Sequence, residues 1–198
     1  MVQVDPRAEE LVSFYINRPP TEWFIPPEGL DMELMTRFGH LVDLARTTDL
    51  DSWSQTSQGA LAMIILLDQI PRNIYRNSPL AFSSDGKALL IASQSVAKGF
   101  DQQCGKLNKA AQTIFYLPFE HSEDLVSQIA AVALFRNFTT SCQERTAEKD
   151  YAMIGVASAQ RHLDCILKLG RFPKRNEALG RETTPEELEF LEQHPNGF

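Results

Sequence analysis

The sequence predicts an all-α protein that folds as a single domain over residues 1–198, with about eight helices. Apolar residues recur along the chain at the three- and four-residue spacing that places them on one face of a helix. No stretch keeps the alternation of apolar and polar residues that a half-buried strand requires. The length of 198 residues lies within the usual range of one domain, so one helical core is expected.

Two helices are expected near the N-terminus. Asp5 and Pro6 form a start signal, in which an N-cap residue is followed by a proline in the first helical turn. The apolar residues that follow share a face until Pro19 and Pro20 end this helix. A second helix is expected from about Asp31, where apolar residues align again.

The third helix is unusual because residues 60–67 are apolar on every side. It begins near Trp53 and reads GALAMIILL before the polar stretch DQIPRN. A helix that is apolar all round is buried at the centre of a core. Pro71 lacks an amide hydrogen and collides with the carbonyl of Leu67, so this helix must kink or end where the polar residues begin.

Start and stop signals place the remaining helices. A helix is expected to restart at Ser78-Pro79, a turn should follow at residues 100–108, and the next helix should break at Pro118. Ser122 is the expected N-cap of the helix that follows.

The C-terminal third should contain a long helix, a connection and a short helix. The long helix is expected to end at Gly170, and residues 171–183 are expected to be non-helical. Thr184–Glu187 reads as a capping box with proline in the first turn, which predicts a last helix.

Composition narrows the classes of function. A net charge of −7 and a pI near 5.1 oppose general binding to nucleic acid or to an anionic membrane, because both favour basic surfaces. The N-terminus lacks the pattern of an export signal, and no segment reaches the roughly 18 apolar residues that span a bilayer. Cys104, Cys142 and Cys165 are odd in number and far apart, which does not suit a disulfide framework. We therefore expect a soluble, cytoplasmic protein with reduced cysteines.

No cofactor and no metal are expected. The chain lacks the GxxxxGKS/T, GxGxxG, HExxH and GxSxG motifs of nucleotide, dinucleotide, zinc-protease and hydrolase sites. The candidate metal ligands are His121, Glu123, Asp124 and His162, and their spacing is not that of a zinc site.

Two segments share a pattern of an apolar residue, a proline, basic residues and an asparagine. They are DQIPRN from Asp68 and GRFPKRN from Gly170, and both lie where a helix is expected to end. Arg and Asn side chains can donate hydrogen bonds to the unpaired carbonyls of such an end, so a structural role is one interpretation.

The alternative interpretation is an anion site. The stretch GRFPKRNEALGR gathers Arg171, Lys174, Arg175 and Arg181 in a chain that is acidic overall. A guanidinium group binds a carboxylate or phosphate through two parallel hydrogen bonds. If these cations instead meet Asp68, Glu123 and Asp124, they form a structural network.

His121 is the best candidate for proton transfer, because it follows Pro118 and precedes two acids at a helix entrance. A histidine beside carboxylates can act as a general acid or base near neutral pH. A histidine at a helix break is also often a hydrogen-bonding plug. His162 lies in an apolar row and is expected to be a satisfied core histidine.

Three blocks of the sequence carry a resemblance to a known family. They read GALAMIILLDQIPRNIYRNSPLAF, FYLPFEHSEDLVSQ and GRFPKRNEALGRETTPEELEFL. In this order they make the chain resemble the family named domain of unknown function 924. The resemblance implies a tetratricopeptide-like superhelical arrangement of antiparallel helix pairs, and it implies no activity. The family pattern is matched by Asp68, Gln69, Pro71, Arg72, Asn73, Tyr116, Pro118, His121, Ser122, Glu123, Asp124, Gly170, Arg171, Pro173, Arg175, Asn176, Gly180 and Arg181.

Three hypotheses of function follow. The first is a helical binding module with a polar groove, bordered by the kinked helix, HSED and the arginine loop, for a small anionic ligand or an acidic peptide. The second is a cofactor-independent isomerase, lyase or hydrolase in which His121 moves a proton and Glu123 or Asp124 orients it. The third is a scaffold whose charges pair internally. The expected ligand-binding residues are Asp68, Gln69, Arg72, Asn73, Tyr116, Arg171, Arg175, Asn176 and Arg181.

Overall fold

In the computed structural model of this chain, residues 3–106 and 108–194 are described. Those residues form helices and turns without a strand, which confirms the all-α fold class. Several elements are a single turn long, so the described chain has more helical segments than the sequence predicted. The elements are α1 (Pro6–Ile16), α2 (Thr21–Phe24), α3 (Leu30–Arg46), the 3-10 turn η1 (Asp51–Gln55), α4 (Ser57–Ile64), the π-helical turn η2 (Ile65–Gln69), α5 (Ile70–Ile74), the 3-10 turn η3 (Pro79–Ala81), α6 (Asp85–Ala97), α7 (Phe100–Gly105), α8 (Lys109–Ile114), α9 (Leu117–Glu120), α10 (Leu125–Thr140), α11 (Ala147–Leu169), the 3-10 turn η4 (Pro173–Arg175), α12 (Asn176–Leu179) and α13 (Pro185–Gln193).

The described residues group into two compact units. The first unit holds residues 3–76, 80–106 and 108–118, and the second holds residues 77–79 and 119–194. The expected single domain stays a prediction, and so does the superhelical stacking of helix pairs that the family resemblance implies. No helix in the described parts of the chain is long and apolar enough to cross a membrane.

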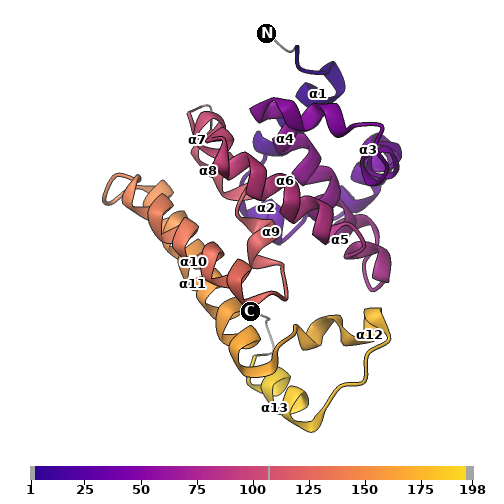
Figure 1. Cartoon of the computed structure of the whole chain (residues 1–198), viewed down its shortest axis with the longest axis vertical. Coiled ribbons are helices and arrows are strands. Elements are labelled where there is room, and N and C mark those ends of the chain that lie inside the picture. The colour runs from indigo at the N-terminus through magenta and orange to yellow at the C-terminus, as the bar shows by residue number, and fades with distance from the viewer. Residues whose placement is uncertain (1–2, 107, 195–198) are drawn as a thin grey trace. The chain divides into compact units, whose positions relative to one another are not determined.

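The first unit is built around α4, as its apolar sequence predicts. Helices α1, α6 and α7 pack against α4 (Figure 1). The side chains from Ala60 to Leu67 are buried all round, so this stretch has no solvent-facing side. Asp5 caps α1 by accepting a hydrogen bond from the backbone amide of Arg7, and Pro6 is the first helical residue, as predicted.

Pro71 is accommodated by a change of helix type rather than by the end of the helix. The π-helical turn η2 precedes it, and the amide of Ile70 bonds to the carbonyl of Ile65, five residues back. This wider turn moves the carbonyls away from the positions at which the proline ring would collide with one of them. The chain then continues as α5, so DQIPRN lies within a bent helix.

Two predicted boundaries before Pro118 are wrong. The helix expected from Ser78-Pro79 begins only at Asp85, after the short turn η3. The expected turn at residues 100–108 contains α7, because Gly99 takes a left-handed conformation (φ 69°) and reverses the chain before that helix. The break expected near Pro118 is present, because α8 ends at Ile114 and Pro118 lies in the first turn of α9, where a helix tolerates proline.

The second unit contains the antiparallel pair α10 and α11, which lie side by side (Figure 1). The two helices approach closely at Gly155, where an added Cβ would lie 2.7 Å from the ring of Phe135. The N-cap of α10 is Asp124, which accepts from the amide of Ser127, so the prediction of Ser122 as the cap is wrong. Ser122 instead accepts a hydrogen bond from the amide of Asp124.

The chain beyond α11 is more ordered than predicted. Helix α11 ends at Leu169 and Gly170 follows in the left-handed conformation, as its sequence predicts. The connection expected to be non-helical holds η4 and α12, because Pro173 starts a turn. The capping box of α13 is confirmed, with the Thr184 hydroxyl and the Glu187 carboxylate each bonding to the other residue's amide.

Candidate functional site

The DQIPRN segment carries a buried ion pair in the first unit. Asp68 is 0% exposed, and its Oδ1 accepts from Nη2 of Arg72 at 3.0 Å. The same nitrogen donates to Oδ1 of Asp85, the first residue of α6, also at 3.0 Å. Burial alone would lower the pKa of Arg72, but the charges of Asp68 and Asp85 outweigh it and raise this pKa. Arg72 therefore joins the end of the central helix to α6.

The other polar residues of this segment also have partners inside the first unit. The amide nitrogen of Gln69 donates to Asp68, and its Oε1 accepts from the Tyr15 hydroxyl at 3.2 Å. Asn73 donates to the Gln69 carbonyl at 3.4 Å and accepts from Arg76 at 3.2 Å. The bond from Asn73 to the Gln69 carbonyl is of the capping kind that the structural interpretation predicts, whereas the other contacts join side chains.

Tyr116 belongs to a separate polar cluster in the first unit. Its hydroxyl donates to Oδ2 of Asp101 at 2.8 Å and accepts from Nε2 of Gln112, also at 2.8 Å. All three side chains are buried. Burial and the charge of Asp101 raise the pKa of Tyr116 above its usual value, so the hydroxyl stays protonated.

In the second unit, Glu123 holds the loop that follows α11. Its carboxylate accepts two hydrogen bonds from Arg181, at 2.8 and 3.0 Å, and one from the amide of Phe172 at 2.8 Å. Partial burial alone would raise the pKa of Glu123, but these hydrogen bonds and the charges of Arg181 and Arg175 lower it. Arg181 also donates to the Phe172 carbonyl at 2.9 Å, so one fork binds a carboxylate and a backbone group together.

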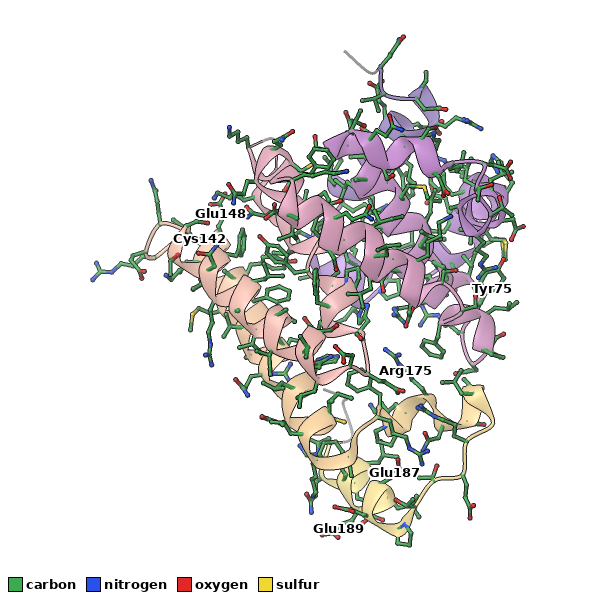
Figure 2. The ribbon with its side chains drawn as sticks, in the orientation of Figure 1. Tyr75, Cys142, Glu148, Arg175, Glu187 and Glu189 are labelled. Carbon is green, nitrogen blue, oxygen red and sulfur yellow. The ribbon has the colours of Figure 1, made fainter. Side chains whose placement is uncertain are left out.

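A second carboxylate, Glu187 of α13, holds the same loop from the other side. It accepts two hydrogen bonds from Arg171, at 2.5 and 2.9 Å, and one from Asn176 at 3.1 Å. The hydrogen bonds of Arg171 are the largest cause that lowers the pKa of Glu187 to about 2, against a smaller effect of burial. Figure 2 labels Glu187, which is buried, and Glu189 on the same helix, which is exposed.

Arg175 lies between these two ion pairs along the loop. Its Nη2 donates to the carbonyl of His121 at 2.7 Å, and its guanidinium carbon lies 4.7 Å from the centroid of the Phe172 ring. Lys174, the preceding residue, is exposed. Both residues belong to η4, so the loop presents two cations from one turn.

The candidate acid–base residues His121, Glu123 and Asp124 each make a different kind of contact. The carboxylate of Asp124 caps α10 and accepts from the Ser127 hydroxyl at 3.0 Å, while Glu123 is paired with Arg181. His121 contributes its carbonyl to Arg175, and its ring centroid lies 6.5 Å from that of His162. The catalytic assignment of His121, Glu123 and Asp124 stays a prediction.

His162 is a core histidine, as its apolar row predicts. Its Nδ1 lies 3.0 Å from the Ser158 carbonyl and 3.1 Å from Oε1 of Glu120, which is itself buried. Burial is the largest cause that lowers the pKa of His162 to about 3, and the charges of His121 and Arg175 lower it further. The imidazole is therefore neutral at physiological pH.

Several partners of the site residues were missed by reasoning from the sequence. Asp85, Asp101, Glu120 and Glu187 complete the pairs of Arg72, Tyr116, His162 and Arg171. Among these four acids, only Glu187 is part of a recognisable sequence motif, the capping box of α13. That motif predicts the start of a helix but not a pair with Arg171. The pair of Glu123 with Arg181 is one that the structural alternative describes. Asp68 instead pairs with Arg72, which is not one of the loop cations.

Comparison with known proteins identifies relatives without a stated activity. The sequence matches the family model described as "Bacterial protein of unknown function (DUF924)" over residues 11–195. A solved structure of a protein of unknown function from Agrobacterium tumefaciens is similar to this chain, with a TM-score of 0.81 and 32% sequence identity. The similarity covers 94% of this chain and 97% of that chain. No curated protein matches the sequence.

Proposed function

Since this chain belongs to the DUF924 family of bacterial proteins, whose description states no activity, we propose a function from its own geometry. The protein is a helical binding module that holds a small anionic ligand or an acidic peptide on the loop after α11. The observation that carries this proposal is the fixation of that loop by two arginine–carboxylate pairs, with Lys174 and Arg175 on the turn between them.

Preorganisation supports the proposal. Arg171 with Glu187 and Arg181 with Glu123 fix the loop at its beginning and towards its end. Asn176, which is 1% exposed, adds hydrogen bonds to Thr183 and Glu187. A loop that is already ordered loses little conformational entropy when a ligand binds, so more of the contact energy becomes affinity.

The chemistry of the turn supports an anionic ligand. Arg175 donates to the His121 carbonyl and lies against the face of Phe172, and these contacts hold the planar guanidinium in one orientation. The guanidinium group has five N–H donors, and its fork matches a carboxylate or a phosphate. The charge of Arg175 also contributes, after burial, to the lowered pKa of His162.

Binding is favoured over catalysis by the positions of the two acids beside His121. Glu123 accepts three hydrogen bonds and Asp124 caps a helix, so both carboxylates already stabilise the structure of the second unit. The thiols of Cys104 and Cys165 are buried, and burial raises their pKa values to about 11 and about 12, so they stay protonated. We place this binding in the cytoplasm, where the three free cysteines stay reduced.

Calorimetric titration of the full chain with inorganic phosphate and with a hexaglutamate peptide tests the proposal. The variant Arg175→Gln should weaken binding of at least one probe by about tenfold or more, because a charge-assisted contact is lost. Lys174→Gln should weaken it less, since an ammonium group makes no paired hydrogen bonds. Arg136→Gln is the matched control, because it removes an exposed arginine from α10 of the same unit.

Two outcomes would contradict the proposal. In the first, neither probe binds the wild-type chain. In the second, Arg175→Gln binds both probes as tightly as the wild type does. Circular dichroism of each variant separates loss of a ligand contact from loss of the fold. If Arg175→Gln unfolds, Lys174→Gln still decides the question, because its side chain is exposed. Failure of binding would leave the scaffold hypothesis in place.

A further inference from the structure

Helix α11 has an exposed stripe over residues 150–161. Asp150, Ile154, Ala157 and Arg161 are all exposed and are spaced by four, three and four residues. This spacing is that of the a and d positions of a heptad, which share one face of a helix. Ile154 is 65% exposed, and Met153 beside it is 52% exposed. The centre of the stripe is therefore apolar and uncovered.

The charges at either side of this apolar centre are arranged symmetrically. Asp150 lies four residues before Ile154, and Arg161 lies four residues after Ala157. Neither charged side chain has an ion pair within the residues that the structure describes. In a helix pair that runs antiparallel about a two-fold axis, residues at equal distances on opposite sides of the centre face each other.

We propose that α11 docks against α11 of a second copy of this chain, as a two-fold antiparallel pair centred between Ile154 and Ala157. Ile154 then packs against the partner's Ala157, whose small side chain permits close approach of the helices. Asp150 faces the partner's Arg161, and the same contact occurs twice because a two-fold interface is self-complementary. Opposite charges at both ends fix the antiparallel register.

The neighbouring helix also carries exposed apolar side chains. On α10, Val126 is 73% exposed and Ile129 is 54% exposed. The pair α10 and α11 is held as one hairpin by the close packing of Gly155 against the Phe135 ring and by the bond from Lys149 to the Thr139 carbonyl. Because the hairpin is fixed, a second copy meets a formed surface and no segment has to order on binding. The charge pattern identifies the occupant as a second copy, because one stripe supplies both halves of the complementary pairs.

Sedimentation velocity of the full chain across a wide concentration range tests the proposal. The wild type should change from monomer to dimer as concentration rises. Ile154→Lys should raise the dimer dissociation constant by at least about a hundredfold, because it buries a charge at the centre of the seam. The matched control is Leu90→Lys, since Leu90 is an apolar residue of α6 that is 58% exposed and lies in the other unit.

A charge reversal tests the register itself. Asp150→Arg alone should weaken the dimer by about a hundredfold, because two like charges then face each other at both ends. Adding Arg161→Asp in the same chain should restore the wild-type dissociation constant to within about threefold. A wild type that stays monomeric at every concentration would overturn the proposal, and so would a dimer that tolerates Ile154→Lys. A double reversal as weak as the single one would overturn the antiparallel register. Circular dichroism confirms that each variant keeps its helices.

Discussion

The segments DQIPRN and GRFPKRN have similar sequences but different structural roles. In the first, the arginine pairs with Asp68 four residues before it on the same bent helix, and with Asp85 at the start of α6. In the second, Arg171 pairs with Glu187 from 16 residues further along the chain. The first segment therefore stabilises a helix that changes type, whereas the second closes a loop between helices.

The ion pair of the first segment also differs, in how far water reaches it, from the pair of Arg181 and Glu123 at the far end of the loop that the second segment begins. Asp68 is fully buried, while the side chains of Arg181 and Glu123 are 20% and 28% exposed. A buried charge that loses its partner has no water to replace it, so removal of that partner is costly. A partly exposed pair is screened and its loss costs less. The comparison teaches that a shared motif does not imply a shared energetic role.

The largest expected effect is that of Asp68→Ala. The change leaves the guanidinium of Arg72 without its buried partner and removes the acceptor of Gln69, so the free energy of unfolding should fall by roughly 3–5 kcal/mol. Urea denaturation followed by circular dichroism measures this change. The control is Asp31→Ala, because Asp31 forms an exposed pair with Arg76 that should be worth about 0–1 kcal/mol. Equal losses in the two variants would contradict the assigned burial of Asp68.

A smaller effect is expected for Arg181→Ala. Glu123 would lose two of its hydrogen bonds, and the loss should be roughly 2–3 kcal/mol because the pair is partly exposed. The variant should also increase proteolytic cleavage in the loop at residues 170–184, because its fixation is lost while the first unit is unaffected. Arg136→Ala, at an exposed position of α10, should change neither quantity. Unchanged cleavage in Arg181→Ala would show that the loop is held by other contacts.

Local signals in the sequence were sufficient for much of the fold. The uninterrupted apolar run of residues 60–67 predicted a central helix. The Asp5-Pro6 signal and the Thr184–Glu187 capping box predicted the starts of α1 and α13, and Gly170 predicted the end of α11. The boundary errors arose where two local rules compete. Pro71, by contrast, was expected to kink or end a helix, and the structure accommodates it with a π-helical turn, one of the places at which helices kink.

The candidate site was less predictable because its partners are distant in sequence. Asp85 and Glu187 carry no feature that marks them as partners of Arg72 and Arg171, and only the packing of helices brings them together. The pairing of Arg181 with Glu123 crosses 58 residues. The sequence pattern predicts that basic and acidic side chains will form ion pairs. Which acid pairs with which arginine depends on the helices that pack side by side. Local rules do not contain that information.

The smallest expected effect at neutral pH is that of Glu187→Gln, which should lower the free energy of unfolding by about 1–2 kcal/mol. The glutamine keeps one acceptor oxygen but loses the charge that holds Arg171. The stabilisation by Glu187 should also depend on pH, which tests the role of its charge in closing the loop of the second segment. The pKa of Glu187 falls from 4.5 in the unfolded chain to about 2 in the folded one, chiefly through the hydrogen bonds of Arg171. A carboxyl group with a lowered folded pKa stabilises the protein above the unfolded pKa, and this contribution is lost as the pH falls through the folded value.

The stability of the wild type should therefore decline between about pH 4.5 and pH 2 more steeply than that of Glu187→Gln. Urea denaturation at a series of pH values measures both slopes. Glu189→Gln is the control, because it removes the same charge from the exposed side of α13 without a contact to Arg171 (Figure 2). If Glu187→Gln and Glu189→Gln have the same slope, Glu187 does not close the loop through its charge. The hydrogen bonds to Asn176 and to the amide of Thr184 would then be the contacts that hold it.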